Sequence, residues 1–249
     1  MNKRDKDVLK ALFTHKYSNQ RELASYIGCS LGAVNASLKT LADSQYIDKY
    51  NRPTQKSEML IEDCAPRRAV LLAAGYGMRQ PNSTARKPKA LQQIGSERLI
   101  DRIIVQLYQA GVKEIYAVVG FAKEQFEYLI DKFGVKLIVN EQYANKNNLH
   151  SLTLAAKHLE NCYVVPCDLY FKTNPFSKTE LYSWYAVSNS RNVESSLRIN
   201  RKQELAVVTS EEEGNVQIGV SYLLKPEADT VASRLAAMDK DRRYKGSFW

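Results

Sequence analysis

The sequence predicts an α/β domain with a mostly parallel sheet in three layers, Rossmann-like in its alternation, preceded by a small helix-turn-helix domain. From residue 69 onward, short apolar runs alternate with amphipathic stretches, a pattern typical of strands and helices around a parallel sheet. Before residue 65, apolar residues recur at helical spacing instead. We therefore divide the 249 residues into an N-terminal domain, 1–64, and a C-terminal domain, 65–249.

Three helices are predicted at the start of the N-terminal domain. Residues 4–14 place their apolar side chains on one helical stripe. Residues 21–27 and 31–44 predict two further helices, separated by a tight glycine turn. Ser18 and Ser30 precede these two helices and are the expected N-caps. The spacing is therefore that of a helix-turn-helix.

A β-hairpin is predicted after the third helix. Residues 46–63 alternate in polarity around the turn-forming Asn51, Arg52 and Pro53. The N-terminal domain thus resembles a winged helix-turn-helix domain of the MarR-like kind, in which the third helix enters the major groove of DNA and the wing contacts phosphates. DNA is therefore a candidate partner, although the face is thinly basic. The alternatives are a homodimer formed through this domain, or packing of this domain on the C-terminal one.

The C-terminal domain is predicted to follow a linker at residues 61–68. Its strands are short and apolar, and its helices carry apolar residues at a spacing of three and four. The expected strands are 69–75, 114–120, 135–140 and 162–171, and the expected helices are 96–112, 123–132 and 151–159.

A candidate phosphate-binding loop follows the first of these strands. The sequence there is LAAGYGMR, residues 72–79, and KPKAL follows at residues 87–91. Small residues let the backbone approach a ligand closely, glycines free several N–H groups to face phosphate, and Arg79 and Lys89 supply positive charge. The dinucleotide fingerprint would need a third glycine, and the P-loop a Gly-Lys-Ser or Gly-Lys-Thr ending. Both are missing, which leaves an ordinary glycine turn as the alternative.

The combined pattern resembles the nucleotidyltransferase superfamily that activates sugar phosphates and alcohol phosphates. The resemblance implies that the loop binds a nucleotide and that Arg79 and Lys89 act on its phosphates. It also implies that Asp168, at the end of a later strand, holds Mg²⁺ against the α-phosphate. The alternative for Asp168 is an aspartate that caps the following turn. The loop residues expected to contact the nucleotide are Leu72, Ala73, Ala74, Gly75 and Gly77.

Residues 120–155 are similar to bacterial phosphocholine cytidylyltransferases, in GFAKEQFEY and in NEQYANKNNLHS. In that family CTP and phosphocholine give CDP-choline and pyrophosphate. The resemblance places Gly120, Asn148 and Ser151 near the nucleotide. The acceptor could also be 2-aminoethylphosphonate or a sugar 1-phosphate, and a regulator that only senses CTP or phosphocholine is the hypothesis from another class.

A quaternary ammonium group has no hydrogen to donate, so its recognition depends on aromatic faces. Tyr222 and Trp249 fall where the resemblance places acceptor-binding aromatics, and Tyr170 is a further candidate. Other family members carry a second metal-binding aspartate beyond the position of Trp249. We therefore expect the sequence to be C-terminally incomplete.

Charge, cysteine spacing and the lengths of apolar runs limit the partners and the cellular location that we expect. The net charge of +9 indicates an anionic partner, and the basic surplus lies mainly outside residues 1–64. The four cysteines form no C-x-x-C pair, so we expect neither zinc nor disulfides. No apolar run is long enough to span a bilayer and the start lacks the pattern of a signal peptide. The expectation is a cytoplasmic protein with no membrane partner.

Overall fold

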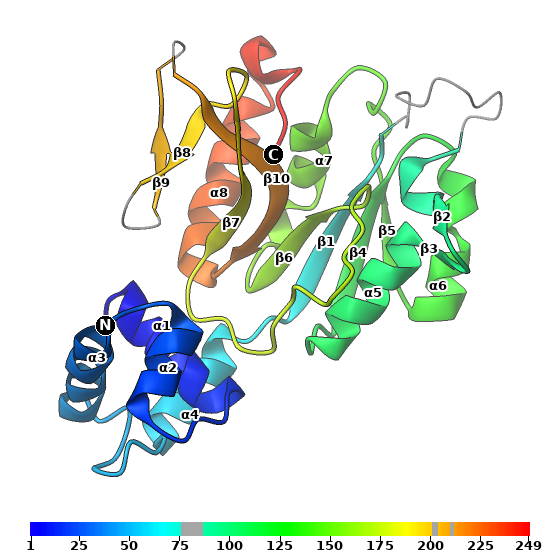
Figure 1. Cartoon of the computed structure of the whole chain (residues 1–249). Helices are drawn as coiled ribbons and strands as arrows, with labels where there is room; N and C mark the ends of the chain where they lie inside the picture. Colours follow the sequence, from blue (N-terminus) through cyan, green and yellow to red (C-terminus); the bar gives the residue numbers. More distant parts are fainter. Residues whose placement is uncertain (76–86, 201–203, 210–211) are drawn as a thin grey trace.

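The computed structural model describes residues 1–75, 87–200, 204–209 and 212–249, and it contains a helical N-terminal unit beside an α/β unit (Figure 1). Within these ranges, no helix has both the length and the apolar character required to cross a membrane. Gly77 and Arg79, two of the predicted loop residues, lie outside the described residues.

Four helices form the N-terminal unit: α1 (Lys3–Thr14), α2 (Gln20–Ile27), α3 (Leu31–Asp43) and α4 (Gln55–Cys64). The N-cap of α2 is Asn19, whose side chain accepts hydrogen bonds from two backbone N–H groups, and not Ser18 as expected. Gly28 ends α2 with a φ of 75°, a left-handed conformation that glycine adopts without steric cost. Ser30 caps α3 as predicted. The helix-turn-helix spacing is therefore present.

The predicted hairpin is wrong in its second half. Residues 55–64 form α4, and the expected wing is reduced to a single bridge between Ile47 and Pro53. Thr54 and Ser57 form a capping box at the start of α4, and most of the residues that follow are good helix formers. These local preferences outweigh the weak alternation that suggested a strand. No wing is identified in the described chain.

A six-stranded sheet forms the centre of the α/β unit, in the order β5-β4-β1-β6-β10-β7. The four strands from β5 to β6 pair in parallel, while β10 pairs antiparallel with both of its neighbours. The sheet is therefore mixed but mostly parallel. Its strands are β1 (Arg68–Ala73), β4 (Glu114–Val119), β5 (Lys136–Val139), β6 (Cys162–Pro166), β7 (Trp184–Asn192) and β10 (Gly214–Leu223).

Helices cover both faces of this sheet and complete three layers (Figure 1). On one face, α5 (Leu99–Gln109) and α6 (Tyr128–Phe133) pack on a core that includes Leu71 and Ile104. On the other, α7 (Asn148–Leu154) and α8 (Lys225–Met238) bury Leu152 and Leu235 against the sheet. Alternate residues of each buried strand thus enter different cores, as the pleat requires.

Short elements join these layers. The predicted helix 96–112 begins later, because residues 93–98 form the small hairpin of β2 (Gln93–Ile94) and β3 (Glu97–Arg98). A second hairpin, β8 (Leu197–Ile199) and β9 (Leu205–Val207), projects beside β10. The 3₁₀ turns are η1 (Lys89–Leu91), η2 (Lys123–Phe126), η3 (Ala156–His158) and η4 (Arg242–Tyr244).

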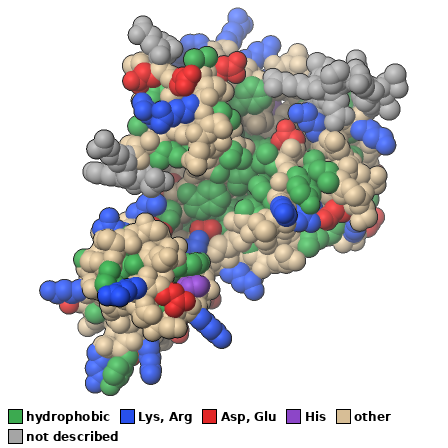
Figure 2. Space-filling model, in the orientation of Figure 1, with side chains coloured by type: hydrophobic (Ala, Val, Ile, Leu, Met, Phe, Trp, Pro, Cys, Tyr) green, Lys and Arg blue, Asp and Glu red, His purple; other side chains and the backbone are tan. Residues whose placement is uncertain are grey.

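The N-terminal unit packs against the amino-terminal side of the sheet (Figure 1). Leu181 and Tyr182 of the α/β unit belong to the same apolar cluster as the cores of α1, α2 and α3. Tyr222 in β10 donates a hydrogen bond to the carbonyl oxygen of Cys64, the last residue of α4 (2.6 Å). On the face shown in Figure 2, Lys and Arg side chains project from this unit separately and form no continuous basic patch.

Candidate active site

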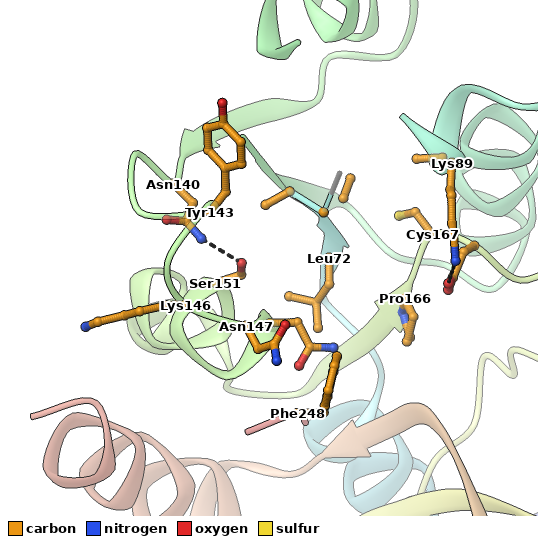
Figure 3. Close-up of a pocket in the computed structure, with 16 residues that line it drawn as sticks. Leu72, Lys89, Asn140, Tyr143, Lys146, Asn147, Ser151, Pro166, Cys167 and Phe248 are labelled. Carbon is orange, nitrogen blue, oxygen red and sulfur yellow. Dashed lines mark hydrogen bonds and ion pairs between the residues drawn. The ribbon is translucent and has the colours of Figure 1, made fainter. Parts of the chain in front are cut away.

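A pocket of about 400 Å³ opens at the carboxyl ends of β1 and β6 (Figure 3). Ligands commonly bind at this edge of a parallel sheet, where the strands end and the loops begin. The described residues that line it are Leu72, Ala73, Ala74, Gly75, Lys89, Ala90, Asn140, Tyr143, Lys146, Asn147, Asn148, Ser151, Pro166, Cys167, Asp168 and Phe248.

The end of β1 forms the floor of this pocket. Leu72 to Gly75, all four predicted from the sequence, line it, and the small residues Ala73, Ala74 and Gly75 leave backbone accessible to a ligand. Gly120, at the end of β4, does not line the pocket but allows this packing. A Cβ atom there would lie 2.6 Å from the Cβ of Tyr143 and 2.9 Å from the carbonyl oxygen of Ala74. Gly120 therefore permits a close approach that any side chain would block.

Lys89 and Asp168 lie together at one side of the pocket. The Nζ atom of Lys89, in η1, is 3.4 Å from Oδ2 of Asp168, which follows β6. Their side chains are 36% and 48% exposed, so water screens the pair and its contribution to stability is small. A ligand phosphate or a cation can therefore replace either partner at little cost. The alternative, an aspartate that caps the next turn, is not supported by the hydrogen bonds among the described residues, in which this carboxylate accepts from Lys89.

Polar side chains of α7 and of the segment before it form the opposite side (Figure 3). The buried Asn140 donates a hydrogen bond from Nδ2 to Oγ of Ser151 (3.0 Å). Because Ser151 accepts this bond, its hydroxyl proton can be donated to a ligand. Asn148 accepts a hydrogen bond from the backbone N–H of Trp249 at its Oδ1 (2.7 Å), so its amide protons face other partners. Asn148 and Ser151, both predicted, line the pocket.

The segment 245–249 crosses the mouth of the pocket and brings residues that the sequence analysis missed. Asn147 donates two hydrogen bonds to this segment: its backbone N–H to the carbonyl oxygen of Lys245 (3.2 Å) and its Nδ2 to the carbonyl oxygen of Gly246 (2.6 Å). The ring of Phe248 then lines the pocket beside Leu72 (Figure 3). Asn140, Tyr143, Lys146 and Asn147 were missed too, although the NEQYANKN run that contains them gave a signal.

The three predicted acceptor residues do not line the pocket. Tyr222 is fully buried, and its ring lies 4.9 Å from that of Tyr163 in the core, because the alternation of β10 turns it away from the pocket. Burial raises the pKa of its phenol. Tyr170 is exposed and covers the guanidinium of Arg102 (4.9 Å). Trp249 is next to Phe248, but its indole donates a hydrogen bond to Ser221 Oγ (3.0 Å).

A cluster of ionisable side chains, Lys146, His150 and Asp239, borders the pocket. Nζ of Lys146 lies 2.9 Å from Oδ1 of Asp239, at the end of α8, and Nδ1 of His150 lies 2.7 Å from the same oxygen. Burial alone would raise the pKa of the Asp239 carboxyl, but the hydrogen bonds from Lys146 and His150 outweigh it and leave this pKa below its usual value. The cluster joins α7 to α8 behind the pocket wall.

The donor set limits which cation could bind. Among the described pocket residues Asp168 is the one carboxylate, and the described chain contains no group of three or more His, Cys, Asp or Glu placed to hold a metal. The thiol of Cys167 is buried, and that burial raises its pKa. An ion bound here would need oxygen ligands from a substrate, which suits Mg²⁺ with a polyphosphate.

Comparison with known proteins identifies the class. Residues 69–190 match the MobA-like NTP transferase domain family. The chain belongs to the MobA-like nucleotidyltransferases and is related to a choline-phosphate cytidylyltransferase of Streptococcus pneumoniae. The two are 35% identical over 170 residues, which cover 67% of this chain and 74% of the relative.

Two further similarities support this membership. A solved structure of CTP:phosphocholine cytidylyltransferase from Streptococcus pneumoniae superposes with a TM-score of 0.63 at 32% identity, covering 74% of this chain and 82% of that one. A 2-aminoethylphosphonate cytidylyltransferase from Lancefieldella rimae is 38% identical over 101 residues, covering 40% of this chain and 41% of the relative. The predicted nucleotidyltransferase fold is therefore confirmed.

Proposed function

We propose that this protein transfers CMP from CTP to phosphocholine, giving CDP-choline and pyrophosphate. The observation that carries the proposal is the pocket itself, in which Lys89 and Asp168 meet beside the floor formed by Leu72–Gly75. The names of the relatives add the substrate class: the Streptococcus pneumoniae relative and the solved structure from the same species are both named as cytidylyltransferases of phosphocholine.

The reaction requires stabilisation of charge more than a strong base. A phosphate oxygen of the acceptor attacks the α-phosphorus of CTP, the bond from that phosphorus to the bridging oxygen breaks, and pyrophosphate leaves. Negative charge develops on the α-phosphate oxygens, so fixed cations aimed at them lower the barrier. Lys89, which lines the pocket, is proposed for that role. Arg79 is proposed, from the family resemblance, to hold the phosphates of the same nucleotide, together with Gly77.

Mg²⁺ is the proposed cofactor, with Asp168 as its protein ligand. The half-exposed carboxylate of Asp168 can give one or two of the six oxygens that Mg²⁺ requires, and triphosphate oxygens and water would supply the others. When bound, the ion would offset charge at the α-phosphate. Lys89, which pairs with Asp168 in the described structure, would then be released toward the phosphates.

Nucleotide selection is assigned to the polar side of the pocket. Cytosine presents both hydrogen-bond donors and acceptors, and Ser151 and Asn148 can supply matching groups. The buried hydrogen bond from Asn140 fixes the orientation of the Ser151 side chain. A fixed side chain discriminates between bases better than a mobile one, because no rotamer freedom is lost on binding.

For the acceptor, the lining favours a quaternary ammonium over a primary amine. Phe248 and Tyr143 offer aromatic faces, whereas a primary ammonium, with three protons to donate, needs several acceptors. Asp168 is the only carboxylate among the described lining residues and is proposed for the metal. Phosphocholine is therefore favoured over 2-aminoethylphosphonate as the acceptor, while a sugar 1-phosphate would need more hydroxyl partners.

The proposal predicts pyrophosphate release that depends on CTP, Mg²⁺ and phosphocholine together. The assay compares CTP with UTP, ATP and GTP, and phosphocholine with 2-aminoethylphosphonate and glucose 1-phosphate, using the full chain. Preference for CTP with another acceptor would revise the substrate. Tight CTP binding by calorimetry with no pyrophosphate from any acceptor would contradict the enzyme and favour the regulator that senses CTP.

A further inference from the structure

Asp168 begins a long connection, residues 168–183, which leads from β6 to β7 and contains no helix or strand. A segment of this length without its own hydrogen-bond ladder is placed by contacts with its surroundings. In Figure 1 it runs from the pocket edge of the sheet to the N-terminal unit. Whatever fixes the connection therefore also restricts the backbone that carries Asp168.

Helix α5 fixes the first half of the connection. Arg102 donates from Nε to the carbonyl oxygen of Phe171 and from Nη2 to that of Lys172, each at 2.8 Å. The ring of Phe176 then packs edge-on against Tyr163, with centroids 5.0 Å apart. Tyr163 lies in β6, the strand that ends just before Asp168.

Helix α1 of the N-terminal unit fixes the second half. Glu180 is 3% exposed, yet it carries a carboxylate. Its Oε1 accepts a hydrogen bond from the hydroxyl of Tyr163 (2.8 Å), and its Oε2 accepts one from Nζ of Lys10 in α1 (2.9 Å). A buried carboxylate that loses its cation is strongly unfavourable. Lys10 is the cation recorded with Glu180 in the described chain, so α1 holds the connection in place.

The next two residues reinforce this attachment. Leu181 is 1% exposed and lies in the apolar core that Val8 and Leu9 of α1 share with α3. The hydroxyl of Tyr182 donates a hydrogen bond to Asp7 of α1 (2.5 Å). Glu180, Leu181 and Tyr182 thus contact α1 through an ion pair, through apolar packing and through a hydrogen bond, in that order.

We propose that α1 is a positioning element of the active site: through Lys10, Glu180 and Leu181 it holds the connection 168–183 and so sets the position of Asp168. The route is short, because Tyr163 bonds Glu180 at one end and belongs to the strand that delivers Asp168 at the other. The N-terminal unit would then support catalysis without touching a substrate. This inference rests on the proposed function for its kinetic part only.

The test is Lys10→Met in the full chain, with Lys10→Arg as the conservative variant and Lys16→Met, an exposed lysine of the same unit, as the matched control. Hydrogen exchange by mass spectrometry follows the backbone of residues 167–176 and 177–183 separately. Turnover is measured against Mg²⁺ and against CTP. Lys10→Met is expected to speed exchange in both segments, to lower kcat about tenfold and to raise the half-saturating Mg²⁺ several-fold, with KM for CTP little changed. Lys10→Arg and Lys16→Met should behave as the parent.

Faster exchange confined to residues 177–183, with an unchanged response to Mg²⁺, would overturn the proposal and leave Lys10 a purely structural residue. If Lys10→Met fails to fold, the double variant Lys10→Met/Glu180→Gln removes the unpaired charge and is measured in its place against Glu180→Gln alone. If the parent shows no turnover, the proposed function fails, and exchange at residues 167–176 still decides whether α1 positions Asp168.

Discussion

Two lysine–carboxylate pairs, at opposite edges of the sheet, are built for opposite purposes. Lys89 and Asp168, at the pocket, lie 3.4 Å apart with side chains 36% and 48% exposed. Lys10 and Glu180, between the two units, lie 2.9 Å apart, and the Glu180 side chain is 5% exposed. The first pair can exchange partners with a substrate, whereas breaking the second leaves a buried charge. We therefore expect the exposed pair to bind a ligand and the buried pair to hold the two units together.

The largest effect is expected at the exposed pair. Lys89→Met and Asp168→Asn should each lower kcat/KM by about 10²- to 10³-fold, because each removes charge stabilisation at the α-phosphate. The free energy of unfolding should change by less than about 1 kcal/mol, as expected for screened groups. Pyrophosphate release and urea denaturation measure the two quantities. Lys113→Met, an exposed lysine at the other end of the strands, is the control, and comparable loss there would remove the assigned roles.

Between the units, the expected effect is on stability. Leu181→Ala removes a side chain that is 1% exposed within the core of the N-terminal unit, and should cost about 2 to 5 kcal/mol. Leu205→Ala, at a leucine that is 43% exposed in β9, should cost less than about 0.5 kcal/mol. Denaturant unfolding followed by circular dichroism compares them. Equal costs would show that the attachment of the two units is weaker than its burial indicates.

A smaller, pH-dependent effect is expected at Asp239, whose partners are Lys146 and His150. Because its pKa is lower in the folded chain than in the unfolded one, the carboxylate stabilises the fold above the unfolded pKa, near pH 4, and this stabilisation is lost as pH falls through the folded pKa. The stability difference between the parent and Asp239→Asn should therefore shrink between about pH 5 and pH 2. Asp229→Asn, an exposed residue of α8, should show no such trend.

The sequence predicted elements best where one local pattern decides them. The runs that became β1, β4 and β6 are short, apolar and buried, so their pattern and their burial agree. The apolar run that became β5 was also predicted, although it lies at the edge of the sheet and is only partly buried. The strand expected in place of α4 failed because a capping box is a stronger local signal than imperfect alternation. Strands β7 and β10 were not predicted. The residues of β7 are half-buried or exposed and give a weak pattern, and β10, although mostly buried, is placed by pairing with segments distant in the sequence.

The residues of the candidate site also fall into those that a local pattern predicts and those that only the fold brings together. Leu72–Gly75 and Lys89 belong to one compact run, and Asp168 follows a recognisable strand, so their meeting at one sheet edge could be expected. The place of Phe248 depends on hydrogen bonds between Asn147, Asn148 and a segment about a hundred residues later. No local pattern reports such a contact. Tyr222 was expected at the site but lies in the core, because its register in β10 decides which face of the sheet its side chain enters.

The insertion of Leu181 into the helical unit bears on how this protein can be divided. A cut at the end of α4 would separate the two domains that the sequence predicts, yet it would leave an apolar gap among the helices and an unpaired carboxylate, Glu180, on the α/β unit. The helices are thus part of the enzyme's scaffold, and grafting them onto another nucleotidyltransferase would require transplanting residues 179–182 as well.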